Sequence, residues 1–440
     1  MVAALVYHAW QGWGLGKSYP DNTFLFYPED RYGDFTNTYR YAETEAPYRY
    51  SGGGANYFPA TFLIFDVFGW LPPVPATILF LGLCSAGLFV VLEAALRSAV
   101  PHPGWRVLSC TVFLWTFPVL LCLDRGNTEL LLVALVAASL FFYSRKKFAL
   151  SFLFLLLPIC FKLFPALLLL LFFRPRLFHW FFAGILGFAL VSWLALLTMQ
   201  GTVTENFASL LNQMAIYNKV GVLSYNGIAG SASAWNSFRI LTWLYYYHSH
   251  QSPEYVGQLP LPVAHNALMV YDGFVLAGLI LLTLYVLFVE TSFARRLVLL
   301  LLFMTVSAPG AGDYKLMYVD IALVTLVLIP DRRPWDLVVT CLLAVCLLPK
   351  RECILHFMGV SDSGRYDATI GVILNPLCML FSMALLVWSG WTVLRPLRLK
   401  QRFWKLLSLF RFAGLRPLWV KQRPVVQVTR PRRSRPARKR

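Results

Sequence analysis

Long apolar runs constrain this chain more than any other feature of its sequence. A run of about 18 or more apolar residues is typical of a helix that crosses a membrane. Four runs meet that length: Val74–Leu96, Leu177–Leu197, Val263–Val289 and Gly371–Leu394. The chain is 58% hydrophobic and only 14% charged, whereas soluble domains carry roughly a quarter charged residues. We therefore predict an all-α polytopic membrane protein.

The basic residues are concentrated at the C-terminal end. The net charge is +18, and residues 395–440 contain 16 Lys or Arg and no acid, so the rest carries +2 (18 minus 16). A basic segment directly after the last apolar run is typical of a cytoplasmic tail that binds anionic lipids, which argues against nucleic acid as a partner. We expect residues 1–394 to form the membrane domain. The tail is predicted to hold an interfacial helix in "KQRFWKLLSLFRF" and a disordered end.

Short basic connections predict the orientation of the spans, because Lys and Arg favour the cytoplasmic side. These connections are Ser144–Lys147, Arg174–Arg176, Ala294–Arg296 and Asp331–Pro334. The two long polar loops, residues 17–57 and 201–262, are then extracytoplasmic. This threading requires that the apolar stretches 58–71 and 238–247 do not cross. The expectation is a multi-pass protein of the plasma membrane, with about 10–12 membrane segments and a cytoplasmic C-terminus.

One lysine interrupts the apolar stretch "FLFLLLPICFKLFPALLLLLFF". Lys162 stands at its centre, and Pro165 follows three residues later. Both flanks of residues 148–173 are predicted to be cytoplasmic, yet about 26 residues are too few for two full crossings. Two half-length helices that break near Lys162 resolve this conflict, since proline cannot donate to a helix ladder. Such a break is tolerated only against protein or an aqueous cavity, so Lys162 is expected to open on a cavity.

Three cations lie at or near predicted extracytoplasmic ends of membrane segments. They are Arg125 in "LDRGNTELLL", Lys162, and Lys315 in "GDYKLMY". Cations in a membrane are costly and by default mark functional sites. Three on one face favour binding of an anion, most simply a phosphate. In the alternative, Asp124 or Asp313 pairs with them in a purely structural network.

The two polar loops offer further candidates. Sugar transfer from a phosphate donor needs a base for the acceptor hydroxyl, together with cations for the leaving phosphate. The first loop holds several carboxylates (Asp21, Glu29, Asp30, Asp34, Glu43 and Glu45), and composition alone prefers none of them. The second loop is rich in amides, hydroxyls and aromatic rings, which suit sugar recognition but also an ordinary interfacial loop. Its candidate contacts are Tyr225, Asn226 and Trp235.

The order of several short motifs supplies a resemblance. Asp34-Phe35 is followed by tyrosines, then by Phe58-Pro59, by Arg125-Gly126-Asn127, and by Lys162 with Pro165. This order, over roughly the first half of the chain, resembles glycosyltransferase family 87. These enzymes are polyprenol-phosphate-mannose-dependent α-mannosyltransferases of the GT-C superfamily. Members carry a complete membrane helix before the aspartate, whereas residues 1–17 are too short to span comfortably. The expectation is that the true start lies upstream or that the first helix is only partly inserted.

The resemblance implies a reaction and assigns roles. Asp34 would be the general base of an inverting transfer from a polyprenyl-phosphate-linked hexose to a lipid or glycan hydroxyl on the extracytoplasmic side. Arg125, Lys162 and Lys315 would bind the donor phosphate, Lys315 by topology alone. Asn127, Tyr39 and Tyr314 would contact substrate. No cofactor or metal is expected: the family does not generally require a metal, and the sequence has no Asp-x-Asp pair. Glu29-Asp30 is the alternative metal position.

Two rival interpretations stay open. A flippase or transporter of lipid-phosphate-linked sugars would also need intramembrane cations and broken helices, and would often show inverted repeats. No internal repeat is visible in the sequence. A non-catalytic assembly subunit would account for the apolar bulk but not for the clustered cations.

Overall fold

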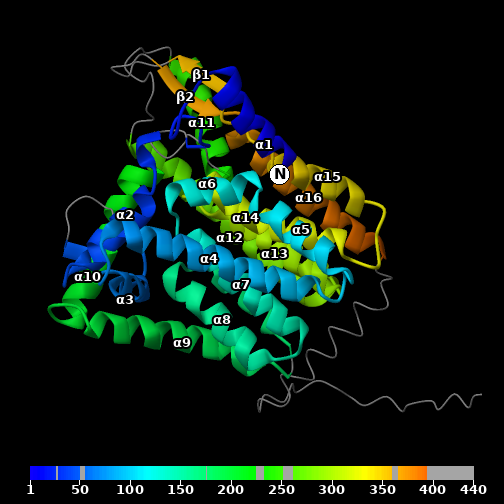
Figure 1. Cartoon of the computed structure of the whole chain (residues 1–440), viewed down its shortest axis with the longest axis horizontal. Helices are drawn as coiled ribbons and strands as arrows, with labels where there is room; N and C mark the ends of the chain where they lie inside the picture. The colour runs from blue at the N-terminus through cyan, green and yellow to red at the C-terminus, as the bar shows by residue number, and fades with distance from the viewer. Residues whose placement is uncertain are drawn as a thin grey trace, which may run out of the picture. The chain divides into compact units, whose positions relative to one another are not determined.

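The computed structural model describes residues 1–25, 28–49, 55–174, 176–223, 232–250, 261–358 and 365–393. These residues are mostly helical, with one short antiparallel hairpin (Figure 1). The helices are α1 Val2–Ala9, α2 Gly33–Ala42, α3 Pro59–Phe68, α4 Pro73–Leu96, α5 Pro103–Leu114, α6 Phe117–Arg125, α7 Glu129–Ser144, α8 Phe148–Phe161, α9 Phe178–Leu197, α10 Val203–Tyr217, α11 Ala234–His250, α12 Leu261–Leu284, α13 Phe293–Ser307, α14 Met317–Val327, α15 Asp336–Cys346 and α16 Gly371–Val393. The strands are β1 Ile354–Met358 and β2 Arg365–Thr369. Three shorter helical segments matter below: η4 Phe164–Phe172, η8 Tyr285–Val289 and η9 Asp313–Leu316.

Among the described residues, four helices are long and apolar enough to cross a membrane. They are Pro73–Leu96, Phe178–Leu197, Pro262–Val289 and Gly371–Thr392, and each coincides with a run predicted from sequence. A fifth span is possible if α5 and α6, which meet at a bend of 59°, count as one. The prediction of an all-α polytopic membrane protein is confirmed. The basic tail, residues 395–440, lies outside the described residues.

Other apolar helices are too short to span alone. They are α3, α7, α8 and α15, with 10, 16, 14 and 11 residues. Proline begins α3, α4 and α5, where its missing N–H costs no helical hydrogen bond. The stretch 58–71, which was expected not to cross, contains the 10-residue helix α3 and no candidate span. Helix α11, which includes residues 238–247, is not among the candidate spans.

The predicted break at Lys162 is present. Helix α8 ends at Phe161, Lys162 is extended (φ −145°, ψ 137°), and the 3-10 helix η4 begins at Phe164. Pro165 falls in the first turn of η4. Two half-length segments therefore meet where the lysine stands.

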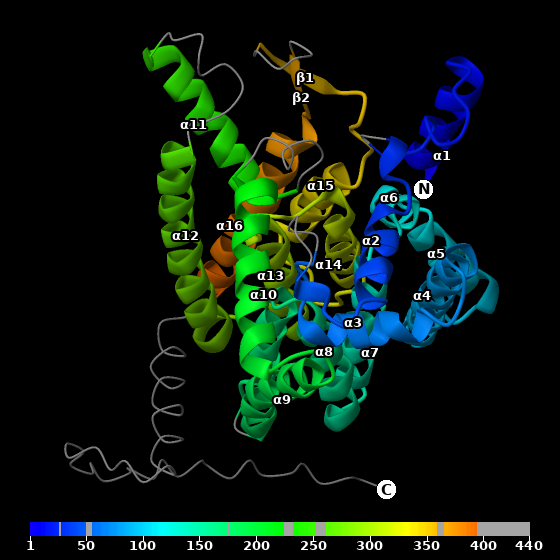
Figure 2. The same ribbon diagram turned by 90° about the vertical axis from the view of Figure 1, so that its left-hand side faces the viewer.

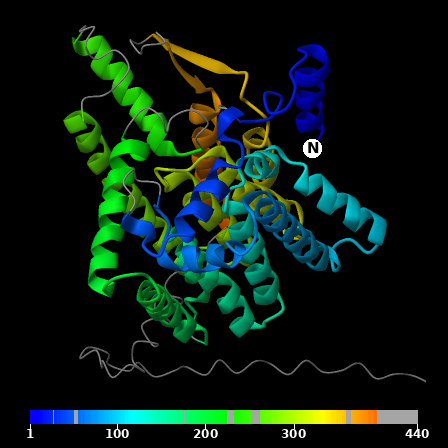
Figure 3. The same cartoon turned by 60° about the vertical axis from the view of Figure 1, so that its left-hand side comes forward.

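Residues 1–394 form one compact unit. Helices α4, α7, α8 and α9 pack in that order, each against the next (Figure 1). A second group joins α13 to α14 and α16, and α16 also packs on α11 and α15. Helix α1, the hairpin and the end of α11 lie at one end of this unit, and α9 lies at the other (Figures 2 and 3). The N-terminal segment is held there because Gln11 Nε2 donates to Glu352 at 2.7 Å.

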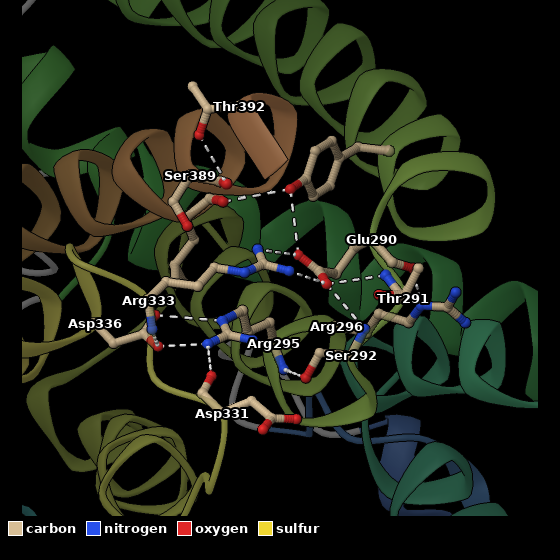
Figure 4. Close-up of polar contacts among 12 residues, drawn as sticks. Glu290, Thr291, Ser292, Arg295, Arg296, Asp331, Arg333, Asp336, Ser389 and Thr392 are labelled. Carbon is tan, nitrogen blue, oxygen red and sulfur yellow. Dashed lines mark hydrogen bonds and ion pairs between the residues drawn. The ribbon is translucent and has the colours of Figure 1, made fainter. Parts of the chain in front are cut away.

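Buried ion pairs fasten the second group together (Figure 4). Arg333, between α14 and α15, donates from both Nη atoms to the Glu290 carboxylate, at 2.8 and 2.9 Å. Arg295 of α13 pairs with Asp336 of α15 at 2.5 Å. The Tyr285 hydroxyl lies 3.4 Å from Glu290 and 3.3 Å from the carbonyl of Leu386 in α16. The basic connections Ala294–Arg296 and Asp331–Pro334, which were predicted to lie on the same side of the membrane, are thus linked by these ion pairs.

Removing one partner of the Glu290–Arg333 pair should destabilise the fold. The Glu290 side chain is 0% exposed, so Arg333→Met leaves a buried carboxylate without its guanidinium. We expect the free energy of unfolding to fall by about 3–5 kcal/mol. The double variant Glu290→Met/Arg333→Met should recover most of that loss, because no unpaired charge remains. Unfolding in detergent micelles measures both, with Arg97→Met, on an exposed pair, as the control. Equal losses in the single and double variants would contradict this account.

Candidate active site

A cavity of about 450 Å³ lies where six parts of the chain meet. Its walls come from α2, from the segment before α3, from the turn between α6 and α7, from the break between α8 and η4, from the end of α10, and from η9 with the turn before it. Its lining includes seven ionisable or polar side chains, namely Asp34, Asn37, Thr38, Arg125, Asn127, Lys162 and Lys315. Every cation singled out from the sequence therefore lies on this one cavity, and so does Asp34.

The first loop reaches the cavity because α2 docks on the end of α6. The Tyr32 backbone N–H donates to the carbonyl of Asp124 at 2.8 Å. Gly126 follows α6 with a φ of 63°, in the left-handed region that favours glycine. A Cβ at Gly126 would lie 2.9 Å from Cβ of Phe35 and 3.2 Å from Cα of Tyr32. Close approach of α2 therefore requires glycine in the Arg-Gly-Asn motif.

Asp34 is held by three donors. Arg125 binds it in a fork, with Nε 2.8 Å from Oδ2 and Nη2 3.1 Å from Oδ1. Asn127 Nδ2 donates to Oδ2 at 2.5 Å, while Asn127 Oδ1 accepts from the N–H of Glu129 at the start of α7. Burial raises the pKa of Asp34, but the Arg125 charge and these hydrogen bonds lower it by more, so the net shift is downward. The carboxylate is therefore ionised and oriented.

Lys162 forms a second ion pair beside the first. Its Nζ lies 2.8 Å from Glu129 Oε1, and the Tyr318 hydroxyl donates to Glu129 Oε2 at 3.0 Å. The Glu129 side chain is 0% exposed, whereas Lys162 keeps 19% of its side chain exposed on the cavity. The ammonium also lies 4.8 Å from the centre of the Tyr57 ring. Lys162 is thus paired with the buried Glu129 and still partly exposed on the cavity.

Lys315 differs from the other two cations. It is 5% exposed, and its Nζ lies 4.4 Å above the ring of Phe164. In the described part of the chain, no carboxylate lies within ion-pair distance of it. Burial lowers the pKa of Lys315 to about 8, opposed by the Glu129 charge and assisted by the Lys162 charge. Lys315, which lies outside the candidate spans, therefore loses its charge in mildly alkaline solution.

Aromatic side chains also line the cavity, next to its cations. Tyr57, Tyr217 and Tyr314 line it, and the guanidinium carbon of Arg125 lies 5.9 Å from the centre of the Tyr314 ring. A Cβ at Gly310 would lie 2.8 Å from the Tyr217 hydroxyl, so glycine there leaves room for that tyrosine. Rings and hydroxyls at one site suit a sugar, which offers both apolar faces and hydrogen-bonding edges.

The acids expected as alternative partners for the cations make other contacts. Asp124 accepts a hydrogen bond from the backbone N–H of Phe24, and Asp313 accepts one from Asn375. Asp30, from the alternative metal position, lies 3.5 Å from Arg125. Among the described residues, no group of three or more His, Cys, Asp or Glu side chains is arranged to hold a metal ion.

Two predicted substrate contacts do not fit their positions. Trp235 is 0% exposed, and its indole N–H donates to the carbonyl of Val222, so no ring face is available to a sugar. Tyr39 is 3% exposed and donates to the carbonyl of Leu71. In both side chains the N–H or O–H donates a hydrogen bond within the protein, as is usual for buried aromatic residues. Tyr225 and Asn226 lie outside the described residues.

Sequence reasoning missed Glu129, Tyr57 and Tyr217. Glu129 could have been found, because it is an acid at the start of an apolar helix, four residues after Arg125. An ionisable residue in such a segment implies a partner. Tyr217 carried no signal, since it ends an ordinary amphipathic helix that begins with a Thr202–Glu205 capping box.

The arrangement brings two kinds of charged group to one cavity. An ionised, oriented carboxylate faces the cavity, and cations lie on the same walls. Three cations (Arg125, Lys162 and Lys315) and one carboxylate (Asp34) line the cavity, and two further carboxylates, Glu129 and Asp30, lie within ion-pair distance of Lys162 and Arg125. Lys315 has no described carboxylate within that distance. The cavity is therefore suited to an anion.

Neutralising Glu129 should destabilise the site. Glu129→Gln keeps the shape but leaves the Lys162 ammonium without its counter-ion, so we expect the free energy of unfolding to fall by about 3 kcal/mol. The control is Glu205→Gln, which removes a carboxylate from an exposed pair with Arg49 and should have little effect. Equal stability of Glu129→Gln and wild type in detergent unfolding would show that the buried pair does not hold Lys162.

A comparison with protein-family models agrees with this chemistry. The model of glycosyltransferase family 87 matches residues 56–309, more than half of the 440 residues. The match includes Arg125, Asn127, Glu129 and Lys162 but neither Asp34 nor Lys315, whose place on the cavity comes from the structure alone. No curated protein and no solved structure matches the chain significantly. The chain therefore belongs to glycosyltransferase family 87.

Proposed function

We propose that this membrane glycosyltransferase moves a hexose, mannose by resemblance, from a polyprenyl-phosphate carrier to a hydroxyl of a lipid or glycan. The observation that carries the proposal is the position of Asp34 on the same cavity as Arg125, Lys162 and Lys315. A base alone would suit many reactions. A base beside three cations suits a reaction in which the base accepts a proton while an anion leaves.

The donor class follows from the charges and from the membrane. Polyprenyl-phosphate sugars are phosphodiesters with one negative charge, an anion that the three cations of the cavity could bind. Their hydrocarbon chain keeps them in the bilayer, beside the apolar helices that carry Lys162 and Arg125. A nucleotide-sugar donor has a pyrophosphate and usually a divalent metal. The described residues contain no metal-binding cluster.

In the proposed reaction the acceptor hydroxyl gives its proton to Asp34. The acceptor oxygen attacks C1 of the hexose from the face opposite the phosphate. The bond between C1 and the phosphate oxygen breaks, and its electron pair leaves with the phosphate. Arg125, Lys162 and Lys315 stabilise the second negative charge that develops there. Attack from the opposite face inverts the configuration at C1.

We place this site on the extracytoplasmic face of the plasma membrane, in a GT-C fold with a cytoplasmic C-terminus. Support comes from the sequence, where Lys and Arg cluster in the connections on the other side. The basic tail would then bind anionic lipids of the inner leaflet.

Transfer and donor binding, measured separately, test the proposal. The assay uses purified protein in lipid nanodiscs, radiolabelled polyprenyl-phosphate-mannose and a membrane lipid extract as acceptor. Asp34→Asn should lower turnover by about 10²–10⁴-fold and retain donor binding, because it removes the base but not the cations. Lys162→Ala should weaken donor binding as well. Asp21→Asn, an exposed carboxylate of the same loop, is the control. Normal transfer by Asp34→Asn would refute its role as base, and normal movement of the lipid across the membrane without transfer would favour a flippase.

The charge on Lys315 predicts how donor binding depends on pH. Its pKa is lowered to about 8, so the ammonium form is present below that pH and is lost above it. The Kd for the donor should therefore increase as pH rises above about 8. In Lys315→Arg the cation persists, because the guanidinium does not deprotonate in this range, and the Kd should stay constant. Identical pH profiles for the two proteins would exclude Lys315 from the phosphate site.

A further inference from the structure

The base required by the proposed reaction is blocked in this structure. Asp34 Oδ2 accepts from Arg125 Nε and from Asn127, and Oδ1 accepts from Arg125 Nη2 at 3.1 Å. A carboxylate oxygen that already accepts a guanidinium N–H is a poor proton acceptor, because protonation would place an acid hydroxyl against a cation. Either Asp34 is not the base, or Arg125 must move.

The Arg125 side chain has space to move within the cavity. Its side chain is 31% exposed and lines the cavity, and in the described part of the chain its third nitrogen, Nη1, makes only a 3.5 Å contact with the half-exposed Asp30. Lys162 lines the same cavity, with 19% of its side chain exposed. A phosphate bound between these cations would offer Arg125 the same forked geometry that Asp34 offers now.

The charges change in the same direction as the reaction. As the hydroxyl proton moves to Asp34, the carboxylate changes from −1 to 0. As the bond between C1 and oxygen breaks, the phosphodiester, at −1, becomes a phosphate monoester at −2. The sum is −2 before and after transfer. One negative charge thus moves from the Asp34 carboxylate to the phosphate, both of which are possible partners of Arg125.

We propose that the donor phosphate unlocks the base: it draws Arg125 away from Asp34 and thereby frees Oδ1 to accept the acceptor proton. Asn127 stays on Oδ2 throughout and keeps the carboxylate oriented, because its own Oδ1 is fixed by the N–H of Glu129. Arg125 therefore has two roles. Before the donor binds it inhibits the base, and after the donor has bound it stabilises the leaving group. Acceptor deprotonation then requires that the donor is already bound.

This inference rests on the proposed function and deepens it. Its physical signature is a higher pKa of Asp34 in the loaded enzyme. The lowered pKa in the empty enzyme has Arg125 as its main charged cause. Among the described residues, the charged and titratable groups that act on Asp34 are Arg125, Asp30, Lys162, Cys122, Tyr57, Tyr217 and Tyr314. Of these, Arg125 and Lys162 would contact the phosphate, and only Arg125 would thereby lose its hydrogen bonds to Asp34.

The experiment labels carboxyl groups with a water-soluble carbodiimide, which reacts with the protonated form. Full-length protein in nanodiscs is treated at pH 6 with and without polyprenyl phosphate, and labelling of Asp34 is read by peptide mass spectrometry. We expect labelling to rise about tenfold with polyprenyl phosphate, which corresponds to one unit of pKa. Arg125→Gln should give the same high labelling without phosphate. Arg49→Gln, a remote arginine on an exposed pair, should behave as wild type.

Binding of tritiated polyprenyl phosphate and sugar transfer, measured on the same preparations, separate the two proposals. If the lipid binds and transfer proceeds but labelling of Asp34 stays flat or falls, and Arg125→Gln also labels as wild type, the unlocking inference is wrong and the proposed function stands. If polyprenyl phosphate does not bind at all, both are wrong. A rise in labelling with bound lipid, reproduced by Arg125→Gln alone, supports the inference.

Discussion

The forked ion pair between Arg125 and Asp34 determines the arrangement around the cavity. It joins the first loop to the end of α6 across 91 residues of sequence. A charge in or near a membrane is costly unless it is paired, and each partner here satisfies the other. Gly126 makes the pair possible, because its left-handed conformation and missing side chain let α2 approach. Without this contact, the carboxylate would belong to a solvated loop.

The second ion pair extends the same principle to the α8–η4 break. Glu129 begins α7 directly after the Arg-Gly-Asn turn, so one short segment fixes both cations. Asn127 links the two pairs, since its side chain contacts Asp34 at one end and the N–H of Glu129 at the other. The buried cluster of Glu290, Arg295, Arg333 and Asp336 pairs its charges fully and leaves none for a ligand. The cavity differs because Lys315 remains unmatched by any described carboxylate.

Much of the fold and of the candidate site was predictable from the sequence, and the missing or incorrect predictions have physical causes. Length and hydropathy predicted all four long helices, and the shortage of residues around Lys162 predicted its break. The distribution of basic connections grouped Arg125, Lys162 and Lys315 together, and the cost of cations in a membrane made them candidates for a site. Glu129, the partner of Lys162, carried a signal in its position at the start of an apolar helix, but the helix dipole also accounts for an acid in a first turn, and it was missed. Trp235 and Tyr39 were misjudged because composition does not tell whether an aromatic N–H or O–H is satisfied inside the protein.

A structure of the protein in nanodiscs with polyprenyl phosphate bound, determined by electron cryomicroscopy, tests the central claim most directly. We predict phosphate density within hydrogen-bonding distance of Arg125, Lys162 and Lys315. Arg125 should have left Asp34, and Asn127 should still contact it. Phosphate density outside this cavity would contradict the account, as would phosphate in the cavity with Lys162 and Lys315 out of reach.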